Sequence, residues 1–280
     1  MVIEYIANTA IRLKRPFDFS FIHQYGTVFK VFGNPGSGNL CFGVENGGSR
    51  YFIKFAGAPK AEYNYASTDK AVQWLKDAKQ VYQDLAHDNV IRFINGEKIG
   101  GGYAAVFEWI DAESIGSSYP LSRQKFMQLP IQAKQRAFED ILNFHVHVAD
   151  CGYVAIDFYA DQIMYDFESN KTTICDIDFY QKSPYYGDMG KWGSANFVSP
   201  EECIPGLRID EITMVYTMGA AAFSIFADHD RSPESWTLSK PLYNIAKKAV
   251  NDDRNLRQQS IGQLVQEWAV CKGDKYRILA

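Results

Sequence analysis

YVAIDFYADQIMYD at residues 153–166 and TICDIDFY at residues 173–180 are the two stretches on which the fold assignment depends. Each is a short apolar strand that ends in acidic side chains beside aromatic ones. A carboxylate at a strand end can orient a hydroxyl nucleophile, and a second carboxylate with a side-chain amide can hold Mg2+ through oxygen. Asp157, Gln162 and Asp178 are therefore candidate site residues, although aspartates in plain turns and solvated caps give the same pattern.

The chain before these stretches has strand-like periodicity up to about residue 56. The apolar segments 25–32, 40–44 and 50–55 are rich in β-branched and aromatic residues, and turn-forming sequences separate them. A helix is predicted next, because apolar residues recur every three or four positions from Val72 to Leu85, after a plausible N-cap at Ser67–Asp69. Strands at 90–93 and 103–109 complete a predicted antiparallel sheet.

Helices dominate from about residue 131. Helical periodicity predicts them at 133–149, 211–226, 242–250 and 260–270, and residues 111–118 have the composition of a linker. We therefore expect an α+β fold of two lobes that together form one domain. Residues 1–110 would form a small antiparallel β-sheet lobe with one helix, and residues 111–280 a larger, mainly helical lobe.

Composition excludes several classes of function. The chain has 280 residues, 46% hydrophobic and 22% charged, with a net charge of −4, so it lacks the basic excess that nucleic-acid binding requires. Its most apolar stretch, Met214–Ala227, is too short for a membrane span, which takes roughly 20 residues. The start MVIEYIA lacks the basic segment of a signal peptide, and five scattered cysteines suit a reducing compartment. We expect a cytoplasmic protein with no nucleic-acid or membrane partner and an undetermined oligomeric state.

A lysine and three glycines suggest a nucleotide site in the smaller lobe. Lys54 ends the third predicted strand, directly after the hairpin that contains Gly33, Gly36 and Gly38. Glycines at a turn let backbone N–H groups approach phosphates, and a strand lysine supplies a positive charge to them. Glycine-rich hairpin tips are also ordinary turns, and strand-end lysines are commonly solvated, so these residues need other support.

That support comes from the order of the motifs, in which the chain resembles the protein kinase superfamily, in particular divergent bacterial Ser/Thr kinases of eukaryotic type. Asp157 matches the catalytic aspartate, Gln162 the metal-binding asparagine five residues on, and Asp178-Phe-Tyr180 the Asp-Phe-Gly motif. The remaining matches are Lys54 with the third-strand lysine, His87-Asp-Asn-Val-Ile with His-Pro-Asn-Ile, Val106–Ile110 with the hinge, Phe197-Val-Ser-Pro-Glu201 with Ala-Pro-Glu, and Asp253–Arg257 with Asp-Pro-x-x-Arg. The resemblance covers residues 25–270.

The resemblance implies an ATP-dependent, Mg2+-dependent transfer of phosphate to a Ser/Thr hydroxyl of a protein substrate. Asp157 would orient the hydroxyl, Lys54 would contact the α- and β-phosphates, and Gln162 with Asp178 would hold Mg2+. The three glycines and the hinge residues Glu108, Trp109 and Ile110 would bind ATP. Arg257 would pair with Glu201.

Several positions depart from the kinase pattern. Ala155-Ile156-Asp157 replaces His-Arg-Asp, so the arginine that binds a phosphorylated activation loop is absent. Tyr159 replaces a lysine that neutralises the transferred phosphate, and Tyr180 replaces glycine. Phe52 replaces a small residue on the face of the strand that carries Lys54, so the nucleotide sits differently or its pocket is partly filled.

The acid that pairs with Lys54 is left open between Asp77 and Glu62. Asp161 is a second possible metal ligand beside Gln162, and Asp176 more plausibly supports the catalytic loop than binds metal. His145 and His147, two residues apart, do not share a helix face, so helix packing is favoured over a zinc site.

Two other functions remain open. A pseudokinase that binds nucleotide or acts as a scaffold would explain Tyr159, Phe52 and Tyr180. A small-molecule kinase of the aminoglycoside or choline type would explain the unusual catalytic loop, but such relatives are expected to lack the Ser199-Pro-Glu201 anchor.

Overall fold

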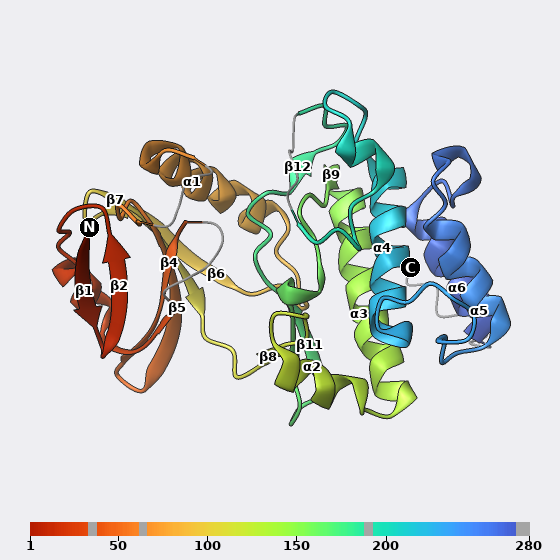
Figure 1. The fold of residues 1–280 in the computed structure, drawn as a ribbon, viewed down its shortest axis with the longest axis horizontal. Helices are drawn as coiled ribbons and strands as arrows, with labels where there is room; N and C mark the ends of the chain where they lie inside the picture. Colours follow the sequence, from red (N-terminus) through yellow and green to blue (C-terminus); the bar gives the residue numbers. More distant parts are fainter. Residues whose placement is uncertain (33–37, 62–65, 188–192, 273–280) are drawn as a thin grey trace. The chain divides into compact units, whose positions relative to one another are not determined.

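The computed structural model describes residues 1–32, 38–61, 66–187 and 193–272 and has a mixed α+β architecture (Figure 1). The chain divides into two compact units. The first comprises Met1–Ala86 with Ile91–Asp111, and the second comprises His87–Val90 with Ala112–Ala280. Residues 87–90 thus belong with the larger unit, whereas the sequence analysis assigned them to the smaller lobe.

The first unit is built on a five-stranded antiparallel sheet with the strand order β3-β4-β5-β7-β6. Its strands are β3 (Thr27–Phe32), β4 (Leu40–Asn46), β5 (Ser49–Ala56), β6 (Phe93–Ile99) and β7 (Gly102–Glu108). The first three confirm the predicted meander. The predicted strand at 90–93 is wrong, because β6 begins only at Phe93 and Val90 pairs instead with Ile174 within the second unit.

Helix α1 (Thr68–Asp84) confirms the helix expected between the third and fourth strands. Ser67 is its N-cap, and the Ser67 side chain accepts a hydrogen bond from the backbone N–H of Lys70 at 3.2 Å. Its buried residues recur at helical spacing: Ala71, Leu75, Ala78, Val81 and Tyr82. The helix packs on the sheet, where the ring centroids of Tyr82 and Phe107 lie 4.8 Å apart.

An N-terminal hairpin covers one face of the sheet and was not predicted. It consists of β1 (Val2–Ile6) and β2 (Thr9–Leu13), followed by the 3-10 helix η1 (Ser20–Tyr25). These elements share a buried core with the sheet: Ile11, Leu13, Phe19, Ile22, Leu40, Phe42, Val44, Ile53, Phe55, Ala58, Ala104 and Val106. Because successive strand residues face opposite sides, the neighbours of Ile53, which are Phe52 and Lys54, lie on the other face.

The second unit is mainly helical. Its helices are α2 (Pro120–Met127), α3 (Ile131–Asp150), α4 (Glu211–Ala227), α5 (Lys240–Ala249) and α6 (Ile261–Lys272). The last four confirm the predicted helices within about two residues. α3 and α4 run side by side (Figure 1), and every residue of α4 from Thr213 to Ala227 is buried. Its apolar run is therefore the centre of a helical core. No helix among the described residues has the length and apolar character needed to cross a membrane.

Two small antiparallel sheets of the second unit hold the loops that carry the candidate residues. One has the order β11-β10-β8, formed by β11 (Lys171–Ile174), β10 (Ile163–Asp166) and β8 (Glu113–Ser114), and the other pairs β9 (Tyr153–Val154) with β12 (Gln181–Lys182). β8 lies inside the stretch predicted to be a linker. Asp157 lies between β9 and β10, and Asp178 lies between β11 and β12. Because β9 pairs with β12 and β10 pairs with β11, strand pairing joins the two loops on both sides of these aspartates.

Candidate functional site

The loop from Asp157 to Gln162 is closed by one of its own side chains. Gln162 ends the 3-10 helix η2 (Ala160–Gln162), and its Nε2 donates a hydrogen bond to the backbone oxygen of Asp157 at 2.6 Å. Asp157 has a φ of 63°, in the left-handed region, where strain in non-glycine residues is concentrated at functional sites. The side chain of Gln162 therefore helps to hold Asp157 in an uncommon backbone conformation.

The other amide atom of Gln162 has no hydrogen-bond partner among the described residues. Because the carbonyl of Asp157 can only accept, Nε2 must face it and Oε1 must point elsewhere. This Oε1 is buried, the residue is 3% exposed, and no residue that the structure describes donates a hydrogen bond to it. A buried acceptor left without a donor costs free energy, and coordination of a metal ion would satisfy it.

Asp178 belongs to the same region of the second unit. The backbone oxygen of Gln162 accepts a hydrogen bond from the backbone N–H of Cys175 at 2.9 Å, which places the two loops next to each other. Asp178, three residues further on, is 8% exposed. Within the described ranges, no group of three or more His, Cys, Asp or Glu could hold a metal ion on its own. Mg2+ bound through phosphate oxygens needs only one or two protein carboxylates, so this donor set still fits it.

Tyr159 lies among carboxylates. Burial, and then the charges of Asp157, Asp161 and Asp176, raise the pKa of the Tyr159 hydroxyl well above its ordinary value. The phenol therefore stays protonated at neutral pH and brings no positive charge to the loop. Tyr159 cannot replace the charge of the lysine that the kinase pattern has at this position.

Asp161 makes local contacts that fasten its loop. One carboxylate oxygen accepts a long hydrogen bond from the backbone N–H of Ser118 at 3.5 Å, and the backbone oxygen accepts one from the Ser114 hydroxyl at 2.9 Å. These bonds attach the loop to the end of β8. The fallback role of Asp161 as a metal ligand is thus less favoured than its role in fastening the loop.

The segment after residue 193 lies against the Asp157 loop. A Cβ atom on Gly193 would come within 3.0 Å of a carboxylate oxygen of Asp157, so a larger residue there would crowd that group. Phe197 is 2% exposed, with its ring 6.3 Å from that of Phe158. Arg231 donates to the backbone oxygen of Asn196 at 2.9 Å. Packing and an arginine outside the loop therefore hold this segment.

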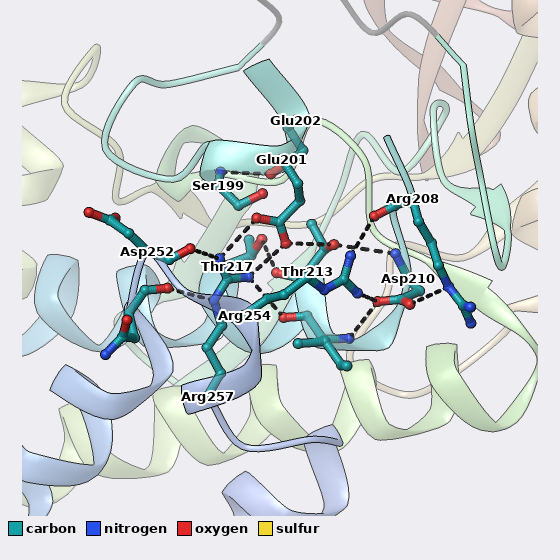
Figure 2. A network of polar contacts seen from close by, with 12 residues as sticks. Ser199, Glu201, Glu202, Arg208, Asp210, Thr213, Thr217, Asp252, Arg254 and Arg257 are labelled. Carbon is teal, nitrogen blue, oxygen red and sulfur yellow. Dashed lines mark hydrogen bonds and ion pairs between the residues drawn. The ribbon is translucent and has the colours of Figure 1, made fainter. Parts of the chain in front are cut away.

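A buried ion pair anchors the end of the segment. Two nitrogens of Arg257 donate to the two carboxylate oxygens of Glu201 at 2.7 and 2.9 Å, and the two side chains are 0% and 6% exposed (Figure 2). Burial raises the pKa of Glu201, but the hydrogen bonds and charge of Arg257 outweigh it and bring the pKa below its ordinary value. The predicted pairing of Arg257 with Glu201 is confirmed.

A wider polar network surrounds this pair at the start of α4 (Figure 2). Glu201 also accepts a hydrogen bond from the Thr213 hydroxyl at 3.0 Å. Asp210, the N-cap of α4, accepts from the backbone N–H of Ile212 and pairs with Arg254 at 2.5 Å and Arg208 at 2.7 Å. The network joins residues from 199 to 257, so it fixes the Ser-Pro-Glu segment on the helical core.

In the first unit, Lys54 lies on β5, opposite Cys41 and Ala105 of the neighbouring strands, and is 5% exposed. Phe52, on the same face, has its ring 5.7 Å from that of Phe32 and 6.2 Å from that of Phe107. Aromatic rings thus occupy the sheet beside Lys54. Phe52 is thus packed among aromatic rings, and both expectations for it, a shifted nucleotide or a partly filled pocket, stay predictions.

The expected hinge residues follow the same sheet. Glu108 ends β7 and pairs with Arg92 at 3.0 Å, and Trp109 donates from its indole to Asp111 at 3.0 Å, while Ile110 is half-buried. Of the three expected glycines, Gly38 has a φ of 79°, and Gly33 and Gly36 lie outside the described residues.

The acid expected to pair with Lys54 is not identified. Asp77 is exposed on α1, away from the buried stripe, and accepts a hydrogen bond from Gln73 at 2.6 Å. This position disfavours Asp77 as the partner of the buried Lys54. Glu62 lies outside the described residues.

Comparison with known proteins does not assign the chain. No family model matches the sequence, and no curated protein matches it.

The sequence analysis missed the role of His145. This residue is 0% exposed on α3; its Nδ1 lies 2.8 Å from the backbone oxygen of Ile141 and its Nε2 lies 3.0 Å from the Tyr180 hydroxyl. Burial lowers the pKa of His145 to about 4. The available signal for its burial was its helical spacing from Ile141 and Val148 on the buried stripe of α3. The sequence analysis considered only the spacing of His145 and His147, which bears on zinc binding.

Proposed function

We propose that this chain is a protein kinase-like phosphotransferase that moves the γ-phosphate of ATP to a Ser/Thr hydroxyl of a protein. The two-lobed kinase fold is part of the proposal. Support comes from the first unit, where a five-stranded antiparallel sheet carries Lys54 on β5 and receives α1 between β5 and β6. Protein kinases likewise place their phosphate-binding lysine on the third strand, before a single helix.

The observation that carries the proposal is the buried pair of Glu201 and Arg257. The kinase resemblance implied this contact between two segments 56 residues apart, although neither segment alone is distinctive. The pair fixes the Ser-Pro-Glu segment that the aminoglycoside and choline kinase relatives are expected to lack. A protein substrate is therefore favoured over a small molecule.

The donor set suits magnesium. Gln162 offers a buried amide oxygen that accepts no hydrogen bond from the described residues, and Asp178 offers a carboxylate from the adjoining loop. When bound, Mg2+ would neutralise the phosphate oxygens of ATP. Both protein ligands are oxygen donors, which is what this hard cation prefers.

Each remaining residue has a defined part in the proposed reaction. The carboxylate of Asp157 accepts the proton of the substrate hydroxyl as its oxygen bonds to the γ-phosphorus, the bond from phosphorus to the bridging oxygen breaks, and ADP leaves. Lys54 contacts the α- and β-phosphates. Gly38 and the hinge residues Glu108, Trp109 and Ile110 hold the nucleotide.

A pseudokinase is the second candidate, and specific observations favour it. Phe52 packs between Phe32 and Phe107 beside Lys54, and Tyr159 adds no positive charge among three carboxylates. Such a chain would bind nucleotide, or act as a scaffold, without transferring phosphate.

Acceptor choice tests the proposal. The purified chain would be incubated with γ-labelled ATP and Mg2+, and with either general protein substrates or a panel of aminoglycosides and choline. We expect label on serine or threonine of protein, and none on the small molecules. Label on a small molecule alone would refute the proposed substrate class. ATP-dependent thermal stabilisation without any transfer would favour the pseudokinase.

A further inference from the structure

His145 lies beneath both loops of the candidate site. Its ring is 4.6 Å from that of Phe158, the residue after Asp157, in an edge-to-face contact. Its Nε2 lies 3.0 Å from the hydroxyl of Tyr180, two residues after Asp178. One fully buried side chain of α3 thus touches the loop of the candidate catalytic aspartate and the turn of the candidate metal ligand.

The hydrogen bonds fix the tautomer of His145. The backbone oxygen of Ile141 can only accept, so Nδ1 must carry the proton that bonds to it at 2.8 Å. The neutral ring then has an unprotonated Nε2, and the Tyr180 hydroxyl donates to it. Burial keeps the ring neutral, since its pKa lies at about 4. The proton of Tyr180 is therefore committed to His145.

We propose that His145 and Tyr180 are positioning residues that set the separation of the Asp157 loop from the Asp178 turn, and so the affinity of the site for a divalent cation. This inference depends on the proposed function for its metal. Neither side chain touches the reacting atoms. They act by fixing the backbone on which Asp157, Gln162 and Asp178 are carried.

The kinase pattern alone does not provide this anchor, because it has glycine where this chain has Tyr180. Glycine has no side chain to fasten the turn, whereas Tyr180 is 1% exposed, and its hydroxyl bonds to a different element of the unit. Packing would be served equally by phenylalanine. The buried hydroxyl of Tyr180 and its directional bond to Nε2 of His145 indicate that the position of the turn is fixed, in addition to the space that the ring fills.

The test compares two tyrosines of the same unit. Tyr180→Phe removes the hydroxyl that bonds to His145. Tyr165→Phe is the matched control, because Tyr165 is also 1% exposed and its hydroxyl donates one hydrogen bond, to Asn170 at 2.9 Å. Both changes keep the ring, so both variants should fold. Thermal midpoints would be measured first, and we expect similar decreases in the two variants.

Metal affinity is the decisive measurement. Mn2+ binding to the full chain would be followed by electron paramagnetic resonance, with a non-hydrolysable ATP analogue present. Loss of a hydrogen bond that supports a metal ligand weakens binding by about tenfold or more, which we expect for Tyr180→Phe and not for Tyr165→Phe. Equal Mn2+ affinities in the two variants would overturn the inference, even if wild type transfers phosphate.

Failure of the proposed function gives a different result. Wild type that binds Mn2+ with the analogue, is weakened by Tyr180→Phe and transfers no phosphate would support the positioning role and refute the kinase activity. Wild type that binds no Mn2+ under these conditions would overturn both.

Discussion

Replacing Arg257 with methionine should destabilise the chain more than any change to a surface ion pair. The change removes both hydrogen bonds to Glu201 and three to backbone oxygens, those of Asn251, Ile212 and Asp252. It leaves a carboxylate that is 6% exposed without its charged partner. Breaking a buried pair in this way costs about 3–5 kcal/mol. Because whole domains are stable by only about 5–15 kcal/mol, the variant should be close to unfolding.

Urea unfolding followed by tryptophan fluorescence would measure this cost, with free energies extrapolated to zero denaturant. Lys125→Met is the control, since Lys125 pairs with Glu113 at 2.9 Å but the two side chains are 53% and 52% exposed. An exposed pair of this kind contributes about 0–1 kcal/mol.

A double-mutant cycle completes the test. Adding Glu201→Leu to Arg257→Met removes the uncompensated charge, so the double variant should be less destabilised than the sum of the single changes, since apolar replacement of both partners is often neutral. If Arg257→Met costs no more than Lys125→Met, or if the single costs are additive, the pair does not anchor the segment as argued.

Three further changes probe other parts of the account. Burial lowers the pKa of His145 from 6.5 to about 4, so the folded chain binds fewer protons than the unfolded chain between these pH values. The free energy of unfolding should therefore fall as the pH falls, by about 2–3 kcal/mol at about pH 4.5. In urea titrations, His145→Gln should lack this part of the decrease. An identical pH dependence in both proteins would contradict it. A ligand at a hundredfold excess over its Kd stabilises the folded chain by about 2.7 kcal/mol. Gln162→Leu should lose the Mg2+-dependent part of this stabilisation by ATP, while Gln162→Asn retains it. Retention in both variants would exclude Gln162 as a metal ligand. Tyr159→Lys should raise the turnover rate about tenfold by supplying the missing positive charge near the phosphate. A rate that is unchanged or lower would contradict the placement of Tyr159 beside the transferred phosphate.

Much of the fold followed from periodicity. α1 and α3 were predicted because their apolar residues recur at helical spacing over many turns, and α4 because its continuous apolar stretch, Met214–Ala227, is typical of a buried helix. The β1–β2 hairpin was missed because each strand is only five residues long, and β1 alternates partly buried and exposed residues, which is a weak signal, although Ile11 and Leu13 of β2 are buried. The strand at 90–93 was misplaced because the chain passes between the two units here. Val90 pairs with Ile174 of β11, and Asn89 donates to the backbone of Thr172 at 3.1 Å, whereas β6 of the first unit begins at Phe93.

The site followed from motif order more than from any local pattern. Glu201 and Arg257 are ordinary charged residues in the sequence, and only the resemblance predicted that they meet. Tertiary contacts that no motif encodes could not be predicted, such as the bond of Tyr180 to His145 and that of Gln162 to the Asp157 backbone. Both depend on how separate elements pack, which a single sequence does not specify.

Phosphate transfer by two aspartate variants tests the central claim most directly. Asp157→Asn keeps the shape of the side chain and removes the group that accepts the proton. Asp166→Asn is the matched control at the end of β10, where the carboxylate accepts local hydrogen bonds from Glu168 and Ser169. With γ-labelled ATP, Mg2+ and a protein acceptor, the account predicts transfer by wild type and Asp166→Asn and a loss of at least about a hundredfold in Asp157→Asn. Equal transfer by all three proteins would contradict it.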